Sequence, residues 1–142
     1  MAARDSLDAL RKRYPAAPSF TFGDSRHLCD ALLALVRQGT KRATCGALRD
    51  YIADGDPLPE PGRADIVLDW DGNPALVIET TDMTIRQFRD VTEEFALAEG
   101  EDETLAGWRA GHRAYFERNG GWSDDMDLVC MRFRLIEDFG SD

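Results

Sequence analysis

The sequence has little positive charge compared with its negative charge. Its 142 residues include 17 lysines and arginines against 27 aspartates and glutamates, for a formal net charge of -10. Such a balance argues against broad, non-specific binding to a phosphate backbone, so a DNA duplex is not an expected partner. A small positive site within an acidic surface remains compatible with this charge.

Cysteines and histidines are also scarce. The three cysteines, Cys29, Cys45 and Cys130, form an odd set without a CxxC spacing. This pattern is typical of reduced thiols in a cytosolic protein rather than of a disulfide framework. The two histidines, His27 and His112, do not form an HExxH motif or a Cys/His ligand spacing, so we expect neither a metal nor a cofactor. Phosphate-binding and dinucleotide glycine motifs are absent as well.

Long hydrophobic segments are missing. The longest uninterrupted apolar run, Ala31 to Val36, is far shorter than the roughly 20 residues that cross a bilayer. Residues 1–14 mix charges through their apolar positions and resemble neither a signal peptide nor a membrane span, so we expect a cytoplasmic protein without membrane partners. The length suits one main domain. A short helix from the Ser6 cap to Arg13, ended by prolines, predicts an N-terminal helical arm over 1–18.

The remaining elements follow from hydrophobic spacing. Helices are predicted after a cap at Asp24 or Ser25 up to Gly39, over 47–52, from Asp90 or Thr92 to near Gly100, and over 101–118. Strands are predicted over 20–22, 64–70, 75–84 and 126–139, with Asp71-Gly72-Asn73-Pro74 turning the middle two into a hairpin. Strands concentrated after residue 63, with helices around them, indicate an α+β domain built on a small barrel or curved sheet.

The segment from Gly39 to Thr44 reads Gly-Thr-Lys-Arg-Ala-Thr and is the first candidate for function. Lys41 and Thr44 share a face only if the chain turns between them, so we predict a turn or bulge there. A lysine whose pKa is lowered can act as a base and activate a threonine hydroxyl. The alternative is that Lys41 is a solvated loop residue and Thr44 caps the next helix.

Glu99 is a second candidate because it ends a predicted helix, where its charge opposes the helix dipole. Facing the Lys41 turn, it could orient the lysine or shuttle a proton. The alternative is an ordinary surface glutamate in an acidic chain.

The predicted helix over 101–118 carries a third group of candidates. Trp108 and His112 share one face, and Arg109 lies on the adjoining one. An aromatic ring and a guanidinium suit stacking on a nucleobase and binding a phosphate. The alternative is that Trp108 belongs to the core and that His112 is a packed or capping histidine.

Several of these motifs occur together in one known family. They are Phe22-Gly23-Asp24, Gly39 to Thr44, Pro57-Leu58-Pro59, Val91 to Ala96 continuing to Glu99-Gly100-Glu101, and Trp108-Arg109 with His112. In this order the chain resembles the ASCH family of the PUA-like superfamily, over nearly everything from Phe20 onward. The resemblance implies a PUA-like small β-barrel flanked by helices over 19–142, with a cleft suited to RNA or a modified nucleoside.

The resemblance also implies a reaction. A group of small bacterial members of the superfamily are amidohydrolases that remove the acetyl group from 4-acetylcytidine with a Lys, a Thr and a Glu. By motif position these would be Lys41 as base, Thr44 as nucleophile and Glu99 as proton shuttle. The residues expected to line the substrate pocket are Arg42, Trp108, Arg109 and His112.

Two other functions stay open at this point. One is a metal-independent ribonuclease, in which Lys41 and Arg109 stabilise the phosphate while His112 or Glu99 moves protons. The other is a non-catalytic module for an RNA end or a small nucleotide. The expected partner is therefore a modified nucleoside or a short single-stranded RNA, and the sequence determines no oligomeric state.

Overall fold

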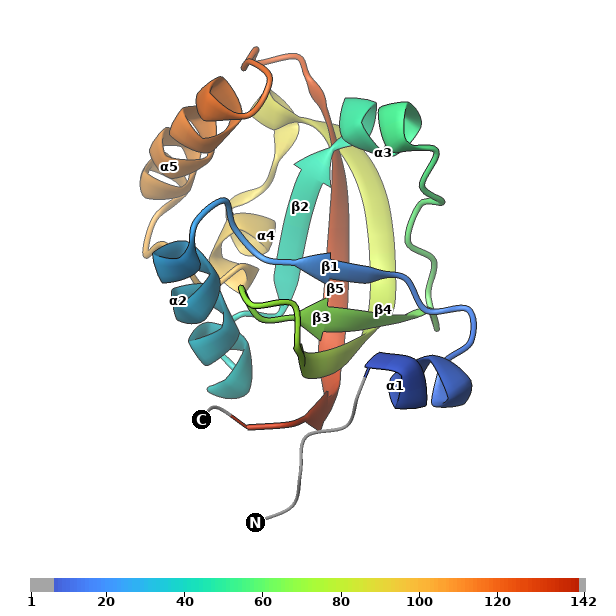
Figure 1. Cartoon of the computed structure of the whole chain (residues 1–142). Coiled ribbons are helices and arrows are strands. Elements are labelled where there is room, and N and C mark those ends of the chain that lie inside the picture. The colour runs from blue at the N-terminus through green and yellow to red at the C-terminus, as the bar shows by residue number, and fades with distance from the viewer. Residues whose placement is uncertain (1–6, 141–142) are drawn as a thin grey trace.

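A curled five-stranded sheet with helices packed around it organises the chain (Figure 1). The computed structural model describes residues 7–140. The strands are β1 (Ser19–Thr21), β2 (Ala43–Ala47), β3 (Ala64–Leu68), β4 (Pro74–Gln87) and β5 (Asp127–Asp138), in the spatial order β1-β3-β4-β5-β2. The helices are α1 (Leu7–Arg13), α2 (Arg26–Arg37), α3 (Leu48–Asp54), α4 (Glu93–Ala98) and α5 (Leu105–Arg118), with a 3-10 turn η1 (Phe88–Asp90). The predicted α+β class is confirmed, and the sheet forms a half-barrel.

The sheet curls because its long central pair is irregular. β3 and β4 form the predicted antiparallel hairpin, and β4, which is 14 residues long, pairs with β5 from Leu76 to Gln87. The register between β4 and β5 shifts at Val77/Ile78 and again at Thr80/Asp82. An extra residue in one strand bends it and increases the local twist, which closes the sheet toward β2.

Alternation along the strands divides the interior into separate clusters. Val67 packs with α2 residues such as Leu32, whereas its neighbour Ile66 packs with Val77 and with Leu10 of α1. Successive strand residues point to opposite faces, so α1 covers the face that α2 does not. A third cluster, around Trp108, joins α4 and α5 to the sheet. In Figure 1, α1 accordingly lies apart from α2, α4 and α5.

Replacing Leu10 with alanine tests how strongly α1 is bound to the sheet. Leu10 is fully buried, so its truncation leaves a cavity and is expected to lower the free energy of unfolding by about 2–5 kcal/mol. Urea denaturation followed by circular dichroism measures the change. The exposed neighbour Arg11, replaced by alanine, is the control and should stay within about 0.5 kcal/mol of the parent. A Leu10 variant as stable as the Arg11 variant would mean that α1 contributes little.

The start of β2 was predicted wrongly. The expected turn at Lys41 to Thr44 is an extended segment that enters β2, where Thr44 pairs with Met131 of β5. The Arg42 amide donates to the Ala98 carbonyl over 2.8 Å, and the Arg42 carbonyl accepts from the Phe133 amide over 3.0 Å. These partners are distant in the sequence, so local spacing could not reveal them.

Two of the predicted helix starts are confirmed. Ser25 caps α2 by accepting from the Leu28 amide over 3.2 Å, and Thr92 caps α4 by accepting from the Phe95 amide over 3.2 Å. The cap expected at Ser6 lies outside the described residues. The helix predicted over 47–52 is confirmed as α3, which lies on the surface with Ile52 71 % exposed. Between residues 7 and 140, none of the helices combines the length and apolar composition needed to cross a bilayer.

Candidate active site

Lys41 is a buried ammonium held between two glutamates. It is 1 % exposed, and its Nζ donates to the Ala43 carbonyl over 2.8 Å, to Glu101 Oε2 over 2.8 Å and to Glu99 Oε1 over 3.3 Å. Burial alone lowers the pKa of Lys41, but the charges of Glu99 and Glu101 outweigh it and hold the pKa above its usual range. The solvated-loop alternative for Lys41 is therefore wrong, and so is the surface alternative for Glu99.

The two glutamates reach Lys41 because Gly100 lies between them. Gly100 has a φ of 74°, in the left-handed region, and a Cβ built on it would lie 2.5 Å from the Thr40 carbonyl oxygen. Only glycine adopts this conformation at so short a distance without strain. The loop after α4 can thus lie directly against the backbone that precedes Lys41, with Glu99 on one side of Gly100 and Glu101 on the other.

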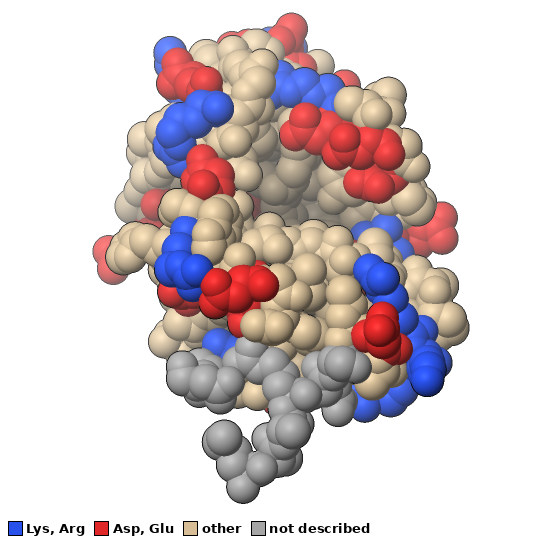
Figure 2. All heavy atoms as spheres, in the orientation of Figure 1, with Lys and Arg blue, Asp and Glu red and all other residues tan. Residues whose placement is uncertain are grey.

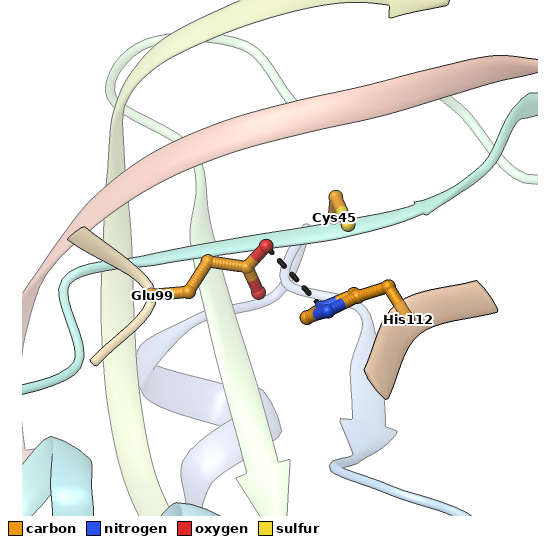
Figure 3. A group of neighbouring side chains, drawn as sticks. All are labelled: Cys45, Glu99 and His112. Atoms are coloured by element: carbon orange, nitrogen blue, oxygen red, sulfur yellow. Dashed lines mark ion pairs between the residues drawn. The ribbon is translucent and has the colours of Figure 1, made fainter. Parts of the chain in front are cut away.

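Three side chains, those of Lys41, Trp108 and His112, contact the Glu99 carboxylate. Its Oε2 accepts from Trp108 Nε1 over 2.7 Å and lies 3.5 Å from His112 Nε2 (Figure 3). Burial would raise the pKa of Glu99, but the Lys41 charge and the hydrogen bonds of His112 and Trp108 lower it to about 2. Glu99 therefore stays ionised and fixes the positions of its three partners.

His112 is oriented from both sides of its ring. Its Nδ1 lies 2.9 Å from the Trp108 carbonyl oxygen, and its ring stacks on the Trp108 indole with centroids 4.2 Å apart. A carbonyl can only accept, so Nδ1 carries a proton and Nε2 faces Glu99. Burial lowers the pKa of His112, but the hydrogen bond and charge of Glu99 outweigh it and raise the pKa above its usual value.

A cavity of about 420 Å³ opens beside this cluster, between α2, β2 and α5. Thr44, Glu99 and His112 line it, together with Glu101 and Tyr115. Figure 2 shows that this face of the molecule is hollowed, with both acidic and basic side chains near the hollow. Three of the predicted site residues thus meet at one cavity.

The other four predicted residues lie elsewhere. Lys41 is absent from the cavity lining, but it binds Glu99 and Glu101, which belong to that lining. Arg42 alternates away from Lys41 in the extended segment and is exposed, and Arg109 lies on the exposed side of α5. Trp108 is fully buried in the core cluster, so it contacts His112 and Glu99 rather than the cavity. The core alternative for Trp108 is therefore correct.

A second cavity, of about 280 Å³, adjoins the first along β2. Both cavities share Thr44, Cys45 and Gly46, so this edge strand forms a common wall. The polar lining of the second cavity includes Arg63 and Asp65, which pair over two contacts of 2.9 Å.

Two residues of the site escaped sequence reasoning. Glu101 was assigned to an acidic start of the next helix, but α5 begins at Leu105 with a cap at Thr104, which leaves Glu101 free to bind Lys41. The sequence feature that could have indicated Glu101 is the pair of glutamates, Glu99 and Glu101, on either side of Gly100. Cys45 was considered only for disulfides and zinc spacing, and its place beside Glu99 depends on the unpredicted strand β2.

The curled sheet with its flanking helices and adjoining cavity defines an α+β domain of the PUA-like class. A family model for the ASCH domain matches residues 18–137, and the chain belongs to the ASCH domain family.

Solved structures agree with this assignment. The ASCH domain from Lactobacillus crispatus is 30 % identical, with a TM-score of 0.78, over 89 % of this chain and 84 % of that one. A protein from Enterococcus faecalis is 31 % identical, with a TM-score of 0.80, over 93 % and 86 %. An ASCH protein from Zymomonas mobilis shares the fold at 10 % identity, with a TM-score of 0.53, over 86 % and 72 %. The search of curated proteins finds no match to the chain.

Proposed function

We propose that this ASCH domain hydrolyses the amide of an acylated pyrimidine nucleoside such as 4-acetylcytidine. The observation that carries the proposal is the buried Lys41 ammonium, whose two glutamate partners line the same cavity as Thr44. A cavity of about 420 Å³ falls in the range typical of small-molecule sites. An uncharged nucleoside also suits an acidic chain better than a polyanion does.

Exposure distinguishes the roles of the charged groups. The Lys41 side chain is fully buried and cannot touch a ligand in the cavity, whereas the Glu101 side chain is 21 % exposed and lines it. We therefore assign proton transfer to Glu101 and a positioning role to Lys41. Glu99 keeps Lys41, Trp108 and His112 in place rather than shuttling protons, because these partners hold its pKa at about 2 and make it a poor proton acceptor.

The reaction then follows in two halves. The Thr44 hydroxyl oxygen attacks the acetyl carbonyl carbon while its proton passes to Glu101. The carbon–nitrogen bond breaks as Glu101 returns that proton to the leaving amino group, which leaves an acetyl ester on Thr44. Water attacks the ester by the same proton path, releases acetate and restores the hydroxyl.

Chromatographic turnover of free 4-acetylcytidine tests the proposal. We expect the parent to release cytidine and both Thr44→Ala and Glu101→Gln to fall by at least about 100-fold, the scale of a lost acid-base group. Glu103→Gln is the matched control, because this exposed glutamate lies in the same loop outside the cavity, and it should keep parental activity. An untouched nucleoside, or equal rates for Glu101→Gln and Glu103→Gln, would contradict the assignment.

The adjoining second cavity favours one alternative, an RNA ligand that extends past β2. A parallel incubation with a single-stranded RNA oligonucleotide and a chelator tests it by cleavage or binding. The ribonuclease alternative places Arg109 at the phosphate. Arg109 is absent from the lining of both cavities, and this absence weakens the ribonuclease alternative.

A further inference from the structure

Three metal-ligating side chains converge from three different elements. Cys45 comes from β2, Glu99 from the end of α4 and His112 from α5, and Figure 3 shows them pointing toward one another. One ligand atom of each lies within 4.8 Å of those of the other two. All three residues also line the larger cavity.

We infer that Cys45, Glu99 and His112 bind a zinc ion whose fourth coordination position opens on the cavity. Thiolate, imidazole and carboxylate are zinc ligands, and three protein ligands with one open position are typical of a zinc site that accepts an external ligand. The thiol selects against magnesium and calcium, which prefer oxygen ligands. This inference goes beyond the proposed hydrolysis and does not depend on it.

His112 is already set to coordinate through Nε2. The Trp108 carbonyl accepts a hydrogen bond from Nδ1 over 2.9 Å, so the neutral ring carries its lone pair on Nε2, the atom that faces Glu99. A backbone carbonyl bonded to the second ring nitrogen is one of the usual partners of a zinc-bound histidine. Stacking on the Trp108 indole holds the ring at this angle.

Glu99 retains room for a metal despite its hydrogen bonds. A carboxylate offers about four lone-pair positions, and Trp108 and Lys41 occupy two of them. When His112 gives up its Nε2 proton to coordinate zinc, it stops donating to Glu99. The Trp108 indole then acts as the outer partner that orients the ligating carboxylate.

The neighbouring charges also balance with zinc in place. Zinc and the Lys41 ammonium bring three positive charges, and Glu99, Glu101 and a Cys45 thiolate bring three negative ones. Binding must release the thiol proton, together with the imidazolium proton where His112 is charged. Lys41 therefore does not exclude the metal, because Glu101 neutralises it at 2.8 Å.

Zinc titration of the metal-free full chain, in competition with a chromophoric chelator, tests the inference. We expect one zinc per chain, and Cys45→Ser and His112→Gln should each weaken binding by at least about 100-fold, because loss of an outer partner alone costs up to that much. Cys29→Ala is the matched control, since Cys29 is buried in the other core cluster and should not affect binding. Magnesium should not compete.

Cobalt provides a second readout that needs no activity. Cobalt bound through Cys45 should give a thiolate-to-metal charge-transfer absorption that Cys45→Ser loses, while circular dichroism verifies that the variant is folded. Absence of zinc binding, or equal zinc affinity of the parent and a folded Cys45→Ser variant, would overturn the inference. Because no substrate is present, failure here is distinguishable from failure of the proposed hydrolysis.

Discussion

Replacing Lys41 with methionine is expected to lower the free energy of unfolding by about 3–5 kcal/mol, the cost of leaving a buried charge without its partner. Methionine preserves most of the volume of the lysine stem but removes the ammonium. Glu99, which is 1 % exposed, then loses its main counter-charge and cannot turn to water. Urea denaturation of the parent and the variant measures the change.

An exposed ion pair provides the comparison for this effect. Arg134 and Glu79 pair over 2.8 Å at the surface, where ion pairs contribute about 0–1 kcal/mol, so Arg134→Met should cost little. The double variant Lys41→Met with Glu99→Gln should recover part of the loss, because it removes the orphaned charge. Equal costs for Lys41→Met and Arg134→Met would show that burial of the Lys41 pair has no energetic consequence.

The sequence correctly predicted the helices and the hairpin whose ends are determined by residues close to them in the chain. Ser25 and Thr92 are hydroxyl caps that accept from amides three residues ahead, and Asp71 to Pro74 turns the β3–β4 hairpin. Strand β2 was missed because its pairing partners belong to β5, more than 80 residues further along the chain. A segment of five small residues at the edge of the sheet carries no alternation that would reveal it.

The candidate site shows the same limit. Lys41 was chosen for its spacing to Thr44 and Glu99 for its place at the end of a predicted helix, and the structure joins them across 58 positions of sequence. Glu101 was not chosen, although it and Glu99 flank one glycine, because its contact with Lys41 depends on the left-handed conformation of Gly100. Trp108 was described by two competing alternatives, core or ligand stacking, while the structure makes it a core residue whose indole nitrogen binds Glu99.

Gly100→Ala is the second change with a large expected effect. The residue needs a φ of 74°, and its Cβ would lie 2.5 Å from the Thr40 carbonyl oxygen and 2.9 Å from the Lys41 amide nitrogen, both backbone atoms that cannot rotate away. The left-handed conformation alone costs a residue with a Cβ about 1–2 kcal/mol. With the added overlap, we expect a total loss of at least about 3 kcal/mol in the free energy of unfolding, within the range of strained backbone sites.

Gly55→Ala separates the cost of the left-handed backbone conformation from the cost of the steric overlap. Gly55 has a φ of 67° at the end of α3, but nothing lies within 4 Å of its hypothetical Cβ. It should therefore show only the conformational cost of about 1–2 kcal/mol. The difference in unfolding free energy between the two variants measures the close approach of the Gly100 loop to the segment before Lys41.

If that difference is zero, the loop moves aside at no cost in free energy, and Gly100 does not hold Glu99 and Glu101 against the Lys41 ammonium. If it is large and Gly100→Ala also loses zinc affinity while Gly55→Ala keeps it, the same glycine positions Glu99 in the zinc site.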